Sequence, residues 1–238
     1  VLDGGAGPRV ILVDNASEPP VAAPDGCHVV RCEVRLTRGA SRNLGLSHVT
    51  SEYVVFLDVD DLVLAGALTR LAAGLDHVAR CPAIVGRIVE PSGALHRTPR
   101  AAAAALARHP RLFAWANATW SMLPTQGCTM MRVSAVRDAG GYADASAGED
   151  WVLGAALAFR GPIAFHSQPA LIYRWRPDSP GAARASRRML LRNAARVRTR
   201  LRDDPRVRGG PVAIGLLAGA QALAVAVARP AARLLRRG

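Results

Sequence analysis

Apolar and polar positions follow two different periods along the first 180 residues. Four short apolar runs are rich in β-branched side chains, which is typical of strands. They are residues 9–14, 28–36, 53–57 and 83–89. Longer segments at 39–50 and 62–78 place apolar side chains at helical spacing. Strands that alternate with helices usually pair in parallel. The pattern therefore predicts an α/β domain with a mostly parallel central sheet flanked by helices.

The last part of the chain has a different pattern. Residues 186–201 predict a helix with many arginines and a narrow apolar side, and residues 212–228 carry no charge. Spanning a bilayer takes ~20 apolar residues, with a lower limit near 17. The uncharged segment could therefore span a membrane, lie in its interface or pack on the domain. We expect three parts: an α/β domain at 1–180, an arginine-rich helix at 181–208 and an apolar helical tail at 209–238.

Basic residues far outnumber acidic ones. The chain has 31 basic side chains, all arginine, and 18 acidic ones, which gives a net charge of +13. This balance favours anionic partners: phosphorylated substrates, acidic lipid surfaces or nucleic acid. The arginines crowd residues 184–208 without interleaved aromatic side chains, which is a poor pattern for nucleic-acid binding. We expect an anionic membrane surface as a partner, and no nucleic acid.

The cysteines indicate a reducing compartment. Cys27, Cys32, Cys81 and Cys128 form no Cys-x-x-Cys pair and have no histidine at metal-binding spacing. Disulfide frameworks are typical of oxidising compartments instead. Together with the basic, apolar tail, this predicts a cytoplasmic protein that associates with the inner face of the cell membrane.

Three carboxylates directly follow the apolar run at 53–57. They are Asp58, Asp60 and Asp61. Clustered acids repel one another unless a cation neutralises them, and open α/β sheets bind ligands at the carboxyl ends of their strands. A hard divalent ion shared with a phosphate would suit such a cluster at the end of a central strand. The alternative is an acidic turn that caps the next helix, and these residues alone leave the two interpretations even.

Two other polar pairs allow a structural and a functional interpretation. Asp14 and Asn15 end a predicted strand, where they can close an Asx turn or hydrogen-bond a nucleotide base or ribose. Glu149 and Asp150 open a predicted helix, where the helix dipole favours acids. An ionised acid at that position beside a pocket is also well placed to act as a general base.

Several short motifs, taken in order, resemble those of the inverting family-2 glycosyltransferases. The motifs are Asp14–Ser17, Ser41–Gly45, Glu52–Asp61, Gly140–Tyr142 and Gly148–Trp151. Each motif is weak alone, but their order within a strand-helix-strand frame is specific. The resemblance ends before the arginine-rich helix. The chain also lacks a counterpart of the strand and Pro-x-Tyr-Asn segment with which that family usually opens.

The resemblance implies a GT-A-like domain that binds a nucleotide-sugar donor and a divalent metal, Mn²⁺ or Mg²⁺. It implies that Asp60 holds the metal and that Asp58 contributes to the metal site or positions the ribose. Asp14 and Asn15 would lie at the nucleotide base. The other donor-binding residues that the motifs and their charge suggest are Ser17, Arg42, Asn43, Arg174 and Arg176.

The same resemblance implies the catalytic residues. Asp150 would be the general base that deprotonates the acceptor hydroxyl, with Glu149 beside it. Attack on the sugar face opposite the leaving diphosphate would give inversion. Two positions depart from the family pattern, because many relatives have Asp in place of Asn15 and His near Arg176.

We therefore expect a hexosyl- or deoxyhexosyltransferase that uses a nucleoside-diphosphate sugar. The expected acceptor is a cell-envelope glycan or a lipid-linked saccharide at the cytoplasmic membrane face. The alternative is a catalytically inactive, truncated relative that acts as a basic membrane-binding module. A nucleotidyltransferase is disfavoured, because the chain lacks the Gly- and Lys-rich loop usually expected of one.

Overall fold

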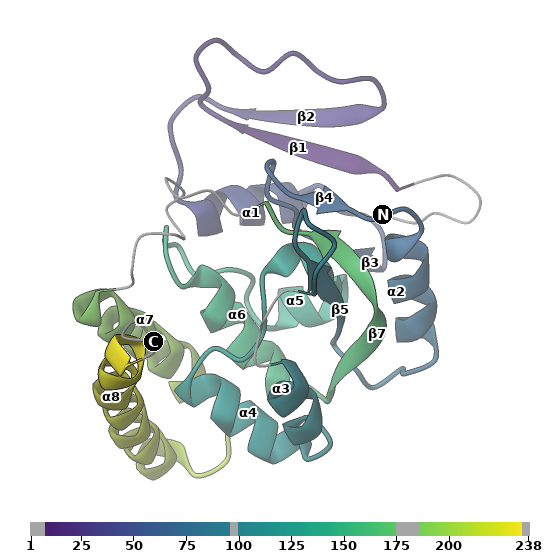
Figure 1. The fold of residues 1–238 in the computed structure, drawn as a ribbon. Helices are drawn as coiled ribbons and strands as arrows, with labels where there is room; N and C mark the ends of the chain where they lie inside the picture. The colour runs from purple at the N-terminus through teal and green to yellow at the C-terminus, as the bar shows by residue number, and fades with distance from the viewer. Residues whose placement is uncertain (1–7, 96–99, 175–185, 235–238) are drawn as a thin grey trace.

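The computed structural model describes residues 8–95, 100–174 and 186–234. Its named strands form two separate sheets (Figure 1). The smaller sheet pairs β1 (Val10–Asn15) in parallel with β2 (Cys27–Cys32). The larger sheet has the order β3-β6-β5-β7-β4. Its strands are β3 (Tyr53–Val54), β4 (Leu62–Val63), β5 (Ala83–Val89), β6 (Thr129–Arg132) and β7 (Ile163–Ile172).

The helices lie between these strands and after them (Figure 1). They are α1 (Arg38–Ser47), α2 (Ala67–Asp76), α3 (Arg100–Leu106), α4 (Pro110–Thr119), α5 (Val133–Asp138), α6 (Glu149–Ala158), α7 (Arg187–Arg202) and α8 (Gly210–Leu234), with a 3₁₀ turn at Gln126–Cys128. The predicted α/β class and the C-terminal helices are therefore confirmed.

The prediction of a mostly parallel central sheet is wrong for the larger sheet. Only β5 and β7 pair in parallel, whereas β6 runs antiparallel to both β3 and β5, and β4 runs antiparallel to β7. The alternation rule assumes one crossover helix between successive strands. Here two helices, α3 and α4, separate β5 from β6, and the chain enters β6 in the opposite direction.

The run at 53–57 is also not a central strand. Tyr53 and Val54 are buried, as the apolar pattern predicts, but they form a two-residue strand at the edge of the larger sheet. The chain leaves the sheet after Val54, while Val55 and Phe56 still pack against the core. The three acids therefore lie on the loop that leads from β3, at one edge of the larger sheet, to β4, at the other edge.

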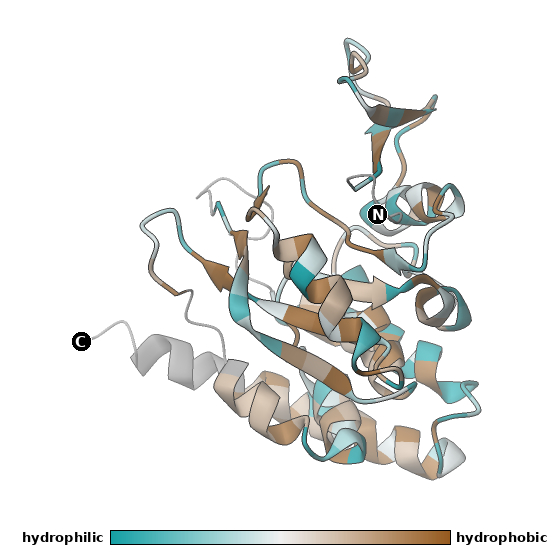
Figure 2. Cartoon of the chain, turned by 90° about the vertical axis from the view of Figure 1, so that its right-hand side faces the viewer, coloured by the Kyte–Doolittle hydropathy of each residue, from teal (hydrophilic) through white to brown (hydrophobic). Residues whose placement is uncertain are grey.

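Two apolar clusters hold the fold together. The main cluster joins the larger sheet to α2, α5 and α6. A second cluster joins α4 and α6 to α7 and α8, so the two C-terminal helices pack directly on the α/β part. Figure 2 shows the apolar colouring of the sheet interior, and shows that it continues along α8.

Candidate functional site

The acidic loop places one buried carboxylate beside two more exposed ones. Asp61 is 5% exposed, and one of its oxygens accepts a hydrogen bond from the Arg174 backbone N–H at 3.2 Å. Its Oδ2 has no hydrogen-bond partner among the described residues. Burial raises the pKa of Asp61, and the charges of Asp58 and Asp60 add to this effect. The loop thus concentrates negative charge that its own contacts leave partly uncompensated.

These acids do not cap a helix. The next element is β4, and α2 begins only after Gly66. The helix-cap alternative is therefore excluded. A hard cation fits the loop, since carboxylate oxygens are its preferred ligands and Asp61 Oδ2 is unsatisfied. In the described residues, no three His, Cys, Asp or Glu side chains are arranged to hold an ion by themselves, so ligands from outside these side chains would have to complete its coordination.

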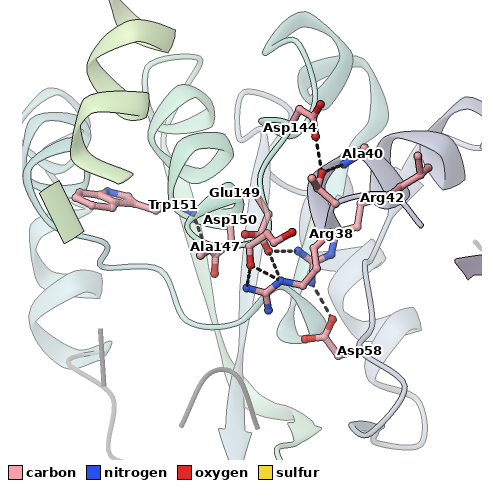
Figure 3. A network of polar contacts seen from close by, with 12 residues as sticks. Arg38, Ala40, Arg42, Asp58, Asp144, Ala147, Glu149, Asp150 and Trp151 are labelled. Carbon is pink, nitrogen blue, oxygen red and sulfur yellow. Dashed lines mark hydrogen bonds and ion pairs between the residues drawn. The ribbon is translucent and has the colours of Figure 1, made fainter. Parts of the chain in front are cut away.

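Arg42 connects the acidic loop to the start of α6. Its guanidinium, on α1, donates to Asp58 Oδ1 at 2.8 Å and to Glu149 Oε1 at 2.7 Å (Figure 3). Burial opposes the charge of Arg42, but Tyr142, Asp58 and Glu149 raise its pKa. Residues that are far apart in the sequence are thus joined in one ion-pair network.

Glu149 and Asp150 have different surroundings although they are neighbours. Glu149 is 2% exposed, and its Oε1 also lies 3.4 Å from Arg38 Nε, while its Oε2 has no hydrogen-bond partner in the described chain. Asp150 is exposed, and its Oδ1 accepts a hydrogen bond from the Trp151 backbone N–H at 2.7 Å. Of the two carboxylates, only Asp150 is accessible to a substrate.

Tyr142 lies among all of these charges. The guanidinium of Arg42 lies over its ring, 5.4 Å from the centroid, and Phe56 packs edge-on against it at 4.8 Å. Burial raises the pKa of Tyr142 well above 10.0, and Asp150, Glu149 and Asp58 raise it further. A neutral, buried phenol thus lies between the acidic loop and the first turn of α6.

Asn43 fixes this arrangement from α1. Its side chain donates to Tyr142 O at 3.0 Å and accepts from Tyr142 N–H at 2.8 Å. Gly141 makes the close approach possible, because a Cβ there would lie 2.6 Å from Asn43 Oδ1. The predicted donor-binding residue Asn43 therefore acts in this structure as a clamp between α1 and the loop before α6.

Asp14 and Asn15, which were predicted to bind the nucleotide base, lie at the end of β1 and form hydrogen bonds within the protein. Asp14 is 2% exposed and accepts hydrogen bonds from Ser17 N–H at 3.0 Å, Val21 N–H at 3.2 Å and Arg31 Nη1 at 2.5 Å. Hydrogen bonds from Ser17 lower the pKa of Asp14, and the bond from the Ser17 side chain has the largest effect. Asn15 donates to and accepts from the Leu36 backbone, at 3.0 and 2.7 Å. The contacts of Asp14 and Asn15 therefore fit the interpretation that these residues close a turn.

The two predicted arginines near the end of β7 have different outcomes. Arg174 Nε donates to the Asp60 backbone oxygen at 2.6 Å, so this arginine lies against the acidic loop. Arg176 lies outside the described residues. Several of the predicted site residues therefore lie in one region of the structure. They are Arg42, Asp58, Asp60, Glu149, Asp150 and Arg174.

Two participants, Tyr142 and Arg38, were not assigned a role from the sequence, and a third, Asp61, was predicted only as a member of the acidic cluster. Tyr142 belongs to a matched motif, and its aromatic ring was a usable signal. Asp61 was seen as an acid, but its burial follows from the position of β4 and β7. Arg38 precedes the Ser41–Gly45 motif by one helical turn, so its spacing from Arg42 was the available signal.

Comparisons with known proteins identify the family and the fold. The sequence profile described as "Glycosyl transferase family 2" matches residues 5–140, more than half of the chain. A search of curated proteins found no match. Among solved structures, TarS residues 1–349 from S. aureus in complex with UDP-GlcNAc has a TM-score of 0.63 at 14% identity, and covers 90% of this chain and 62% of that one.

The same S. aureus protein without a named ligand gives similar values. TarS 1–349 has a TM-score of 0.61 at 13% identity, over 90% of this chain and 60% of that one. The longer TarS structure has a TM-score of 0.56 and is covered over only 34% of its length. The present chain thus spans about 60% of the TarS fragment, and at this identity the similarity establishes the fold.

Proposed function

The chain belongs to glycosyl transferase family 2 and has a GT-A-like fold, and we propose that it transfers a hexosyl or deoxyhexosyl group from a nucleoside-diphosphate sugar to an acceptor hydroxyl, with inversion. We further propose that the acceptor is a cell-envelope glycan or a lipid-linked saccharide at the cytoplasmic membrane face.

The Arg42 bridge is the observation that supports this proposal most directly. A transferase needs one region that binds the leaving diphosphate and another that accepts a proton, held at a fixed separation. Arg42 contacts Asp58 on the first side and Glu149, next to Asp150, on the second. Both predicted regions are therefore joined through a single side chain.

The donor side combines carboxylates with an arginine. Asp58 and Asp60 would hold Mn²⁺ or Mg²⁺ together with oxygens of the diphosphate, and the ion would supply positive charge for the leaving group. Arg174, already bonded to the Asp60 backbone, adds a guanidinium that can bind phosphate. Asp14, Asn15 and Ser17 contribute the turn at the nucleoside end of the site.

The acceptor side rests on Asp150. Its exposed carboxylate would take the proton of the acceptor hydroxyl while the acceptor oxygen bonds to the anomeric carbon. The bond between that carbon and the diphosphate oxygen breaks, and the nucleoside diphosphate leaves. Since the incoming and outgoing oxygens lie on opposite faces, the product is inverted. Glu149 is buried against Arg42 and Arg38 and would orient Asp150 rather than exchange the proton.

Calorimetric titration with nucleoside diphosphates tests the donor site. The panel should begin with UDP, because TarS has been solved with UDP and UDP-GlcNAc, and should be run with and without Mn²⁺. We expect metal-dependent binding that Asp60→Ala abolishes. Asp203→Ala, which removes an exposed acid beyond α7, is the matched control and should bind normally.

Donor hydrolysis and transfer assays test the chemistry. Asp150→Asn is expected to keep donor binding and to lose about 10²–10⁴-fold in rate, the usual contribution of a general base. NMR of the product's anomeric proton reports the stereochemistry. Full activity in Asp150→Asn would refute the assigned base, and a folded protein that binds no donor would favour the inactive membrane-binding relative.

A further inference from the structure

Over residues 211–227, helix α8 has an apolar outward side, where a helix on the surface of a soluble protein is normally polar. Between residues 211 and 227 its single polar side chain is Gln221. Gln221 is 1% exposed, donates to Ala118 O at 2.8 Å and accepts a hydrogen bond from Arg198. The polar group of this segment therefore faces the protein, together with Ile214 and Leu217 of the second apolar cluster.

Between residues 211 and 227, the opposite side of α8 is entirely apolar. Val212, Leu216, Leu223 and Val227 are between 59% and 74% exposed. The remaining exposed positions in this stretch are Pro211, Gly215, Gly219, Ala220, Ala222 and Ala226. We call these ten residues the outer face of α8. It extends over roughly 25 Å of helix, whereas the outward side of a helix on a soluble protein is normally polar.

The helix α7, which packs against α8, carries a dense set of arginines. Residues 187–208 contain nine arginines and two acids, and many of these arginines are exposed. The exposed ones are Arg187, Arg188, Arg192, Arg202, Arg206 and Arg208. Helices with an apolar side and nearby cationic side chains bind the interface of anionic bilayers. The positive charge of these arginines therefore indicates that the outer face would contact an anionic bilayer.

The packing of α8 determines how it can meet a membrane. By length and composition it is the one membrane-span candidate among the described helices. Its inner side, however, packs against α4 and α7 (Figure 1), and Arg198 of α7 bonds to Gln221 midway along it. A transmembrane position would carry the arginines of α7 into the hydrocarbon, which is costly. Docked in this way, α8 can only lie along the membrane plane.

We propose that the outer face of α8 binds an anionic lipid bilayer, with the helix lying flat in the interface and the arginines of α7 at the headgroups. This inference does not depend on the proposed transfer reaction, because vesicle binding requires no sugar donor. It goes beyond that reaction by assigning the surface and the orientation that keep the protein at a membrane.

Vesicle co-sedimentation tests the proposal on the full chain. We expect binding to mixed phosphatidylcholine and phosphatidylglycerol vesicles, weaker binding to phosphatidylcholine alone, and loss of binding as salt rises. Leu216→Ser and Leu223→Ser should each weaken binding by about tenfold. Val34→Ser and Leu95→Ser alter exposed apolar residues outside α8 and should bind as the original chain does.

Further measurements separate this proposal from its competitors. Carbonate should release the bound protein, because an interfacial helix does not cross the bilayer; retention after carbonate would refute the flat orientation. Nucleotide titration of the double leucine variant should be unchanged, which separates this surface from the donor site. A stable dimer that the leucine changes dissociate, without vesicle binding, would show that a second copy covers the outer face and would overturn the proposal.

Discussion

Replacing Arg42 by Met is the most direct test of the network that joins the acidic loop to α6. Methionine keeps much of the apolar length of the side chain but removes both ion pairs, at 2.8 Å to Asp58 and 2.7 Å to Glu149. The contact with Asp58 is half-exposed and contributes little. The contact with Glu149 is different, since the glutamate is buried and, among the described residues, keeps only the ion pair with Arg38, 3.4 Å away.

The expected loss follows from this burial. Breaking a buried ion pair by removing one partner costs about 3–5 kcal/mol. Because Arg38 still faces the same oxygen, we expect Arg42→Met to lower the free energy of unfolding by about 2–3 kcal/mol. For a chain of this size, that corresponds to a decrease in Tm of about 4–12 °C.

Urea unfolding followed by circular dichroism measures the effect, with an unchanged m-value as the condition for comparison. The double variant Arg42→Met with Glu149→Gln should regain part of the loss, since no buried charge is then left without its partner. Arg35→Met, at an exposed arginine, should change stability by less than about 0.5 kcal/mol. A loss below about 1 kcal/mol in Arg42→Met, or no recovery in the double variant, would refute the reasoning.

Three further predictions concern the surrounding structure. Gly141→Ala should destabilise the fold by about 2 kcal/mol, because it adds backbone strain at φ +63 and displaces the Asn43 side chain. Gly26→Ala, at φ +75 but with open space around the new Cβ, should cost only about 1 kcal/mol, and thermal unfolding compares the two variants. The lowered pKa of Asp14 predicts stability that is present above pH ~4 and is lost below it, and Asp14→Asn should flatten that acid limb of the unfolding curve. Burial raises the pKa of Tyr53 to about 12, so stability should decline from pH ~10 upward, and Tyr53→Phe should make this decline shallower.

The apolar pattern predicted where most elements lie but not how the strands pair. The apolar run at 83–89 forms β5, and its side chains are buried on both faces of the sheet, as a continuous apolar run predicts. The run at 53–57 looks similar in sequence, yet only its first two residues pair, at a sheet edge. Strand direction depends on the α3 and α4 pair between β5 and β6, and a count of alternating elements does not contain that information.

The site was predictable where its chemistry is local. The acids at 58–61 and the acidic start of α6 are visible as short motifs. The bridge through Arg42 is not, because it joins residues 16 and 107 positions away. The sequence also left open whether Asp14 and Asn15 close a turn or face a ligand, since that depends on the position of Arg31 and Leu36.

The separate β1–β2 sheet has a consequence for how the molecule opens. Only Asp14 and Cys32 are buried in its two strands, whereas six of the seven residues of β5 are buried. A two-stranded sheet has little stability of its own, so this unit should unfold locally at a lower free energy than the larger sheet. Hydrogen–deuterium exchange should therefore label the amides of β1 and β2 well before those of β5. The nucleoside end of the proposed site would then open and close on its own, while the acidic loop and the first turn of α6 stay assembled.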